Sequence, residues 1–81
     1  MRKKIVAGNW KMNNDLKDTQ LLIEDLKGLT LASDVSVMVA PTFVNLTAAL
    51  DTAATTPIEV IAQNMHFADS GAYTGEISAD M

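Results

Sequence analysis

Three short aliphatic runs, at residues 4–8, 35–40 and 58–62, constrain the fold of this chain more than any other feature. Most positions in each run are apolar on both faces of an extended chain, and the runs are followed by a polar residue or a proline. Such runs are typical of strands that are covered on both faces, as in parallel sheets. We therefore predict three buried parallel strands.

Segments with helical spacing separate the three runs. In the segment 16–26, most of the leucine and isoleucine side chains share one helical face, residues 13–15 offer N-cap side chains, and Gly28 is a natural end. In the segment 44–54, apolar residues recur at the spacing of a short amphipathic helix. The order β-α-β-α-β implies right-handed parallel crossovers, either in an open doubly wound sheet or in part of a closed barrel. Periodicity alone does not choose between these two folds.

The composition narrows the class of protein. With 81 residues the chain forms at most one small domain, and without cysteine it has neither disulfides nor thiolate metal sites to reinforce a small core. The net charge of −4 argues against nucleic-acid binding through a broad basic face. No apolar run is long enough to span a membrane, and the run after residue 4 is too short for a secretion signal. We therefore predict a cytoplasmic protein without a membrane or nucleic-acid partner.

The segment 8–13 directly follows the first predicted strand, at the end of the sheet where parallel α/β folds bind their ligands. In an extended chain Asn9 and Lys11 would point to the same side, so that an amide and an ammonium converge. Together they offer hydrogen-bond donors and a fixed positive charge to an oxygen-rich anion, but no base. The spacing by itself favours ordinary turn and surface residues.

Two strings of residues resemble segments of the triosephosphate isomerase family. Residues 7–13, Ala-Gly-Asn-Trp-Lys-Met-Asn, are similar to the segment after that family's first strand, and residues 62–64 and 71–78 are similar to its third strand and the long loop that follows. The resemblance covers the whole chain, with the three strands in the family's order. It implies a (β/α)8 TIM barrel of about 250 residues. Residues 1–81 would then be the N-terminal part of one incomplete barrel domain.

The resemblance also implies a reaction and the residues that serve it. Members of the family interconvert dihydroxyacetone phosphate and glyceraldehyde 3-phosphate through an enediolate, in glycolysis and gluconeogenesis, without a metal or cofactor. Lys11 would attract the substrate phosphate and stabilise negative charge, and Asn9 would donate a hydrogen bond to the reacting oxygens. The family's catalytic glutamate and histidine belong to later strands, so we predict that this chain alone is inactive.

In the family, the loop after the third strand docks beside the active site of a second subunit, which implies a homodimer. Thr74 would then approach the partner's Asn9 and Lys11. Glu76 would meet a cation of the partner, and Met12 would be covered by the incoming loop. Without the resemblance, the same residues are typical of a polar surface loop that turns at its glycines.

Two further polar residues near the third strand invite a functional interpretation. His66 is the only histidine, but it lies near no cysteine or clustered carboxylates, so we predict that it is solvated and is not the acid or base. Gln63, at the end of the third strand, either orients neighbouring site residues or satisfies backbone groups, and the sequence leaves both roles open.

Two other functions remain open on the residues alone. The chain could be a small non-catalytic phosphate-binding α/β module that uses Lys11 and Asn9, or an interaction segment that folds only with complementary barrel segments. Three strands leave two unpaired sheet edges and an uncovered inward face. We therefore predict aggregation or a molten state for the isolated chain.

Overall fold

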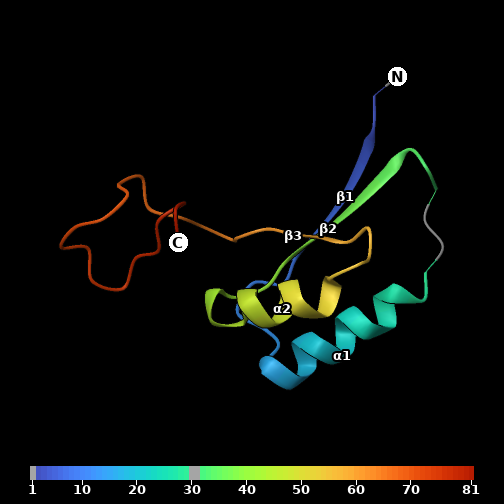
Figure 1. Cartoon of the computed structure of the whole chain (residues 1–81), viewed down its shortest axis with the longest axis horizontal. Coiled ribbons are helices and arrows are strands. Elements are labelled where there is room, and N and C mark those ends of the chain that lie inside the picture. Colours follow the sequence, from blue (N-terminus) through green and yellow to red (C-terminus); the bar gives the residue numbers. More distant parts are fainter. Residues whose placement is uncertain (1, 30–31) are drawn as a thin grey trace.

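The computed structural model describes residues 2–29 and 32–81, which form a parallel sheet of three strands packed against helices (Figure 1). The elements, in chain order, are β1 (Lys4–Asn9), α1 (Leu16–Lys27), β2 (Val35–Ala40), the 3₁₀ turn η1 (Phe43–Asn45), α2 (Leu46–Ala53) and β3 (Glu59–Val60). The strands lie in the order β1-β2-β3. The predicted β-α-β-α-β arrangement is therefore confirmed, and it is that of a partial TIM barrel.

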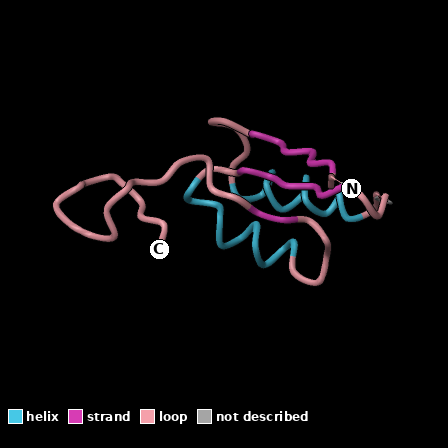
Figure 2. The backbone as a smooth tube through the Cα atoms, turned by 90° about the horizontal axis from the view of Figure 1, so that it is seen from above, coloured by secondary structure: helices cyan, strands magenta, loops and turns pink. Residues whose placement is uncertain are grey.

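Both helices lie on the same face of the sheet, as two right-handed crossovers in the same direction require (Figure 2). The helix α1 begins where the Asp15 carboxylate accepts a hydrogen bond from the backbone N–H of Asp18 at 2.9 Å, and its C-cap is Gly28. Both ends agree with the sequence prediction. Neither helix has the length and apolar character needed to cross a membrane, within the part of the chain that the structure describes.

The hydrophobic core lies between this helical layer and the sheet. Buried side chains from both helices and from the second and third strand regions meet there, and three partly buried residues pack against them. The buried residues are Ile23, Val39, Ala49, Ala53 and Ile58, and the partly buried ones are Trp10, Leu26 and Val60. The core is therefore centred on β2, which lies between the two other strands of the sheet.

The prediction of three strands buried on both faces is wrong for β1. Ile5 and Val6 point to opposite faces of the sheet, yet they are 61% and 60% exposed. The reason is that β1 is an edge strand, and the helices cover only one face of the sheet. Burial of β1 would require layers that the described residues do not supply.

The strand β3 is shorter than the predicted strand 58–62. Only Glu59 and Val60 pair with β2, although the N–H of Ile61 still donates to the carbonyl of Val39 at 2.9 Å. The carbonyl of Ala40, at the end of β2, faces β1, because successive carbonyls of a strand point to opposite edges, and it accepts hydrogen bonds from the Trp10 N–H and from the side chain of Gln63. Among the described residues, backbone hydrogen bonding between β3 and β2 extends only to Ile61, and beyond it the Gln63 side chain reaches the end of β2.

Residues 64–81, which we call the long loop, project away from the sheet and helices (Figure 1). The loop is closed at its base, where the N–H of His66 donates to the carbonyl of Ile77 at 2.7 Å and His66 forms a parallel bridge with Ser78. All of the hydrogen bonds found for the long loop among the described residues join two residues of the loop itself. The long loop thus follows β3 and is closed by its own hydrogen bonds.

Candidate functional site

Residues 9–14, which we call the Lys11 segment, connect the carboxyl end of β1 to α1. The strand ends at Asn9, whose side-chain oxygen Oδ1 accepts a hydrogen bond from the backbone N–H of Lys11 at 2.9 Å. Lys11 itself has a φ of 56°, in the left-handed region. The chain is therefore not extended at Lys11, as the sequence argument assumed, and the convergence of the Asn9 and Lys11 side chains stays a prediction.

This turn leaves both side chains with free donors. The Asn9 amide uses its oxygen within the turn, and no described residue accepts a hydrogen bond from its NH2 group. Lys11 is exposed, and its ammonium forms no ion pair with any described residue. An amide donor and an uncompensated positive charge are therefore available at the carboxyl end of the sheet, which suits an anionic ligand rich in oxygen atoms.

Gln63 joins the ends of the three strands. Its Nε2 donates hydrogen bonds to the carbonyl of Lys11 and to the carbonyl of Ala40, both at 2.8 Å. The sequence left open whether Gln63 satisfies backbone groups or orients site residues. It does satisfy backbone carbonyls, and because one of them belongs to Lys11, the same contact fixes the backbone that carries the ammonium.

The rest of the Lys11 segment is held by two asparagines. Asn13 donates from Nδ2 to the carbonyl of Trp10 at 2.8 Å, within the segment. Asn45, which is buried at the end of η1, donates from Nδ2 to the carbonyl of Asn14 at 3.1 Å. Sequence reasoning placed position 45 in a helix and missed this contact. Because the two residues are 31 positions apart, no local pattern pointed to it.

The three residues predicted to lie at a dimer interface are all exposed. Met12 is 92% exposed beside Lys11, whereas Thr74 and Glu76 lie in the long loop. Within this chain no hydrogen bond among the described residues joins the long loop to the Lys11 segment. The structure therefore does not bring Thr74 and Glu76 to Asn9 and Lys11 of the same copy.

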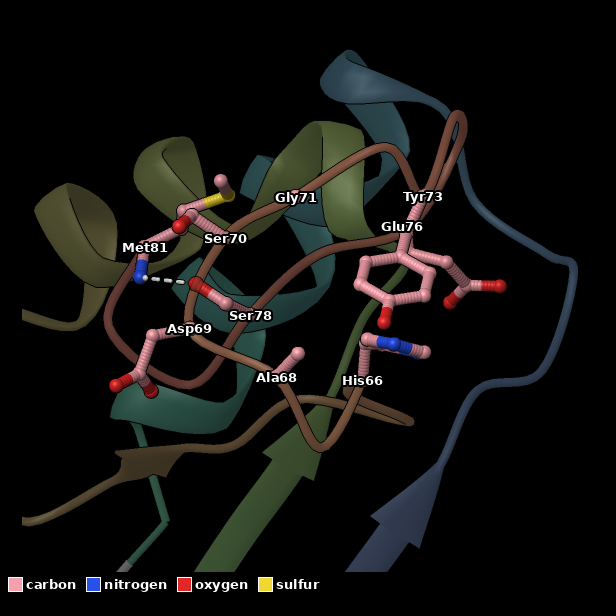
Figure 3. Close-up of a pocket in the computed structure, with 9 residues that line it drawn as sticks. All are labelled: His66, Ala68, Asp69, Ser70, Gly71, Tyr73, Glu76, Ser78 and Met81. Carbon is pink, nitrogen blue, oxygen red and sulfur yellow. Dashed lines mark hydrogen bonds between the residues drawn. The ribbon is translucent and has the colours of Figure 1, made fainter.

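His66 is half-buried, and so less solvated than predicted. Its ring centroid lies 4.1 Å from that of Tyr73 and 4.4 Å from that of Phe67, and Figure 3 shows the His66 and Tyr73 rings facing each other. Its Nε2 is buried and has no hydrogen-bond partner among the described residues. The imidazole lines a cavity of about 40 Å³ inside the long loop. The sequence missed this because both aromatic neighbours belong to the same compact loop, whose shape no periodic pattern encodes.

Comparison with known proteins identifies relatives along the whole chain. A family model described as triosephosphate isomerase matches residues 4–81. The triosephosphate isomerase of Flavobacterium psychrophilum is 56% identical over 82 residues, those of Clostridium botulinum (strain Loch Maree) and Clostridium beijerinckii are 51% and 48% identical over 81, and each match covers 100% of this chain. The chain spans about a third of the length of these curated relatives, 33% in each case.

Proposed function

This chain belongs to the triosephosphate isomerase family, and from that premise we propose that it forms the phosphate-attracting part of a barrel that interconverts dihydroxyacetone phosphate and glyceraldehyde 3-phosphate. The observation that carries the proposal is the Lys11 ammonium, which is exposed, has no ion-pair partner among the described residues and sits on a fixed backbone. We propose the cytoplasm as the site of this reaction.

In the proposed mechanism Lys11 acts by charge. Its ammonium attracts the substrate phosphate and stabilises the negative charge that develops as the enediolate forms. The NH2 group of Asn9 donates a hydrogen bond to the reacting oxygens, while the Asn9 oxygen remains bonded to the Lys11 N–H. Because the backbone is already fixed by Gln63, little reorganisation is needed when the substrate binds.

We further propose that residues 1–81 do not catalyse the reaction alone. Neither an amide nor an ammonium removes the substrate's carbon-bound proton. In triosephosphate isomerases, which are a well-known example of such catalysis, the base is a glutamate and the electrophile is a neutral histidine. His66 is not assigned either role, because it stacks inside the long loop, away from the Lys11 segment. The exposed edge strand β1 supports the same proposal, since an open sheet does not form a closed active site.

The active assembly that we propose is a homodimer in which the long loop of one copy docks beside the Lys11 segment of the other. Thr74 would approach the partner's Asn9 and Lys11, and the loop would cover Met12. Glu76 requires a cation from outside the loop, because the sequence after Lys27 contains no lysine or arginine. The exposure of Met12 and the projection of the long loop both support this arrangement.

The proposed role of Lys11 is tested in a joined barrel, in which this whole chain replaces the matching first third of the Flavobacterium psychrophilum protein. Lys11→Met keeps most of the length of the unbranched side chain and removes its charge. We expect kcat/KM for glyceraldehyde 3-phosphate to fall by about a thousandfold, the scale of a lost charge contact in the transition state.

Lys17→Met is the matched control for Lys11→Met, because Lys17 is also exposed and lies in the first turn of α1. It should leave kcat/KM within about twofold of the parent, the scale expected for a charge away from the reacting atoms. An inactive parent barrel, or equal effects of the two substitutions, would contradict the proposed function.

A further inference from the structure

The Lys11 segment contains two of the three described non-glycine residues that have a positive φ. Lys11 has a φ of 56° and Asn14 has a φ of 70°. Residues with a side chain adopt this left-handed conformation unfavourably, although asparagine tolerates it better than most. Such a conformation persists where the surrounding structure holds it in place.

An amide side chain from another part of the fold holds each of these two residues by its carbonyl. Gln63, after β3, donates to the Lys11 carbonyl at 2.8 Å, and Asn45, before α2, donates to the Asn14 carbonyl at 3.1 Å. The two contacts are alike in chemistry but lie at opposite ends of the stretch 11–14. This stretch is therefore fixed at both ends by side chains that are distant in sequence.

The environment of Asn45 shows that its amide is directed at the segment and not at its own helix. Asn45 occupies the N-cap position of α2, where an asparagine commonly bonds the first free N–H groups, but it makes no such bond. It is only 4% exposed, and its Nδ2 bonds the Asn14 carbonyl and, at 3.2 Å, the hydroxyl of Thr42. Of the two hydrogen bonds that this buried amide donates, one therefore goes to the turn at Asn14 and the other to Thr42.

We propose that Asn45 is a positioning residue for Lys11. By holding Asn14 in the left-handed conformation, it fixes the far end of the stretch whose near end Gln63 fixes, so that the Lys11 ammonium is presented in one orientation. Asn45 touches no substrate and acts only through the backbone. The inference rests on the proposed function, because it gives Asn45 a role in the reaction through Lys11.

The test uses Asn45→Ala in the joined barrel, which removes the donor to Asn14. We expect kcat/KM to fall by about tenfold, because small misplacements of a charged group are costly in the transition state. Asn14→Gly added to Asn45→Ala should restore most of this loss. Glycine adopts a φ near 70° without strain, so the turn no longer needs the hydrogen bond from Asn45 to hold it. Thr47→Ala, at an exposed position of α2, is the control and should leave the rate within about twofold.

The rescue separates positioning from simple loss of packing. If Asn45 only fills space at the start of α2, Asn14→Gly cannot restore the rate, and that result would overturn the proposal, as would a rate for Asn45→Ala equal to that of the parent. Failure of the proposed function is recognised separately, by an inactive parent or a harmless Lys11→Met. The proposed role of the Asn45–Asn14 hydrogen bond is then judged by melting temperature. If Asn14→Gly recovers the melting temperature lost in Asn45→Ala, the result supports this role, and no recovery overturns it.

Discussion

The Lys11 segment and the long loop both follow the carboxyl end of a strand, yet they are held in different ways. The Lys11 segment is bonded by side chains from beyond β3 and from η1, which are far away in the sequence. The long loop is bonded only to itself among the described residues. The Lys11 segment, which carries the positive charge, is therefore fixed by the fold of a single copy of the chain. The long loop is closed by its own hydrogen bonds, and none among the described residues joins it to the rest of the chain.

Among three further variants that probe this difference, the strongest change is expected in the position of the long loop. Thr74→Arg in the joined barrel adds bulk and charge where we propose that the loop packs against a second copy. We expect the dimer Kd, measured by sedimentation over a range of concentrations, to rise by about a hundredfold, or about 3 kcal/mol.

Thr47→Arg is the matched control for this substitution, because it places the same side chain on the exposed surface of α2. It should leave the dimer intact. A Thr74→Arg protein that dimerises as tightly as this control would show that the long loop does not need a partner, and the comparison between the two regions would then fail.

The next effect concerns the Lys11 segment. Gln63→Ala leaves the carbonyls of Lys11 and Ala40 without their side-chain donor. We expect the free energy of unfolding of the joined barrel, measured with denaturant, to fall by about 2 kcal/mol, at about 1 kcal/mol for each of the two hydrogen bonds lost.

Gln20→Ala, at an exposed position of α1, removes the same side chain where it has no partner among the described residues and should cost less than about 0.5 kcal/mol. Equal losses for the two variants would mean that the Gln63 bonds contribute nothing to the stability of the segment.

The smallest effect concerns the internal structure of the long loop. Tyr73→Ala removes the ring that stacks on His66 at 4.1 Å, whereas Tyr73→Phe keeps it. In the monomeric Thr74→Arg background, we expect chymotrypsin to cut after the exposed Phe67 about fivefold faster in the alanine variant, which corresponds to about 1 kcal/mol of ring stacking. Mass spectrometry identifies the cut. Unchanged cleavage in Tyr73→Ala would indicate that the backbone bonds at the loop base suffice.

Local patterns predicted most of the fold because the contacts that form it are local. The N-cap at Asp15 and the end of α1 at Gly28 depend on residues within one turn, and both are confirmed. The predicted end of β3 was wrong because an apolar run shows which residues can form a strand, whereas the length of β3 depends on how far its backbone stays paired with β2. The prediction that β1 is buried was wrong. An apolar run indicates that a strand can be buried, whereas its burial depends on which other elements cover it.

The same difference between local and long-range contacts applies to the candidate site. The strings around Lys11 and Thr74 indicated the family and named the residues that we propose to act, because those identities are written in the chain. They did not indicate the left-handed turn at Lys11 or the part of Asn45 in holding it. A backbone conformation that costs free energy locally is maintained by groups that only folding brings near.

Residue types at short spacing were enough to predict the order of strands and helices, both ends of α1 and the family. Only the tertiary structure decided how the carboxyl end of the sheet is assembled. There, amides at positions 63 and 45 meet the carbonyls of Lys11 and Asn14. Hydrogen bonds between distant positions form only after the parallel strands have aligned their ends, and that alignment is a property of the packed sheet.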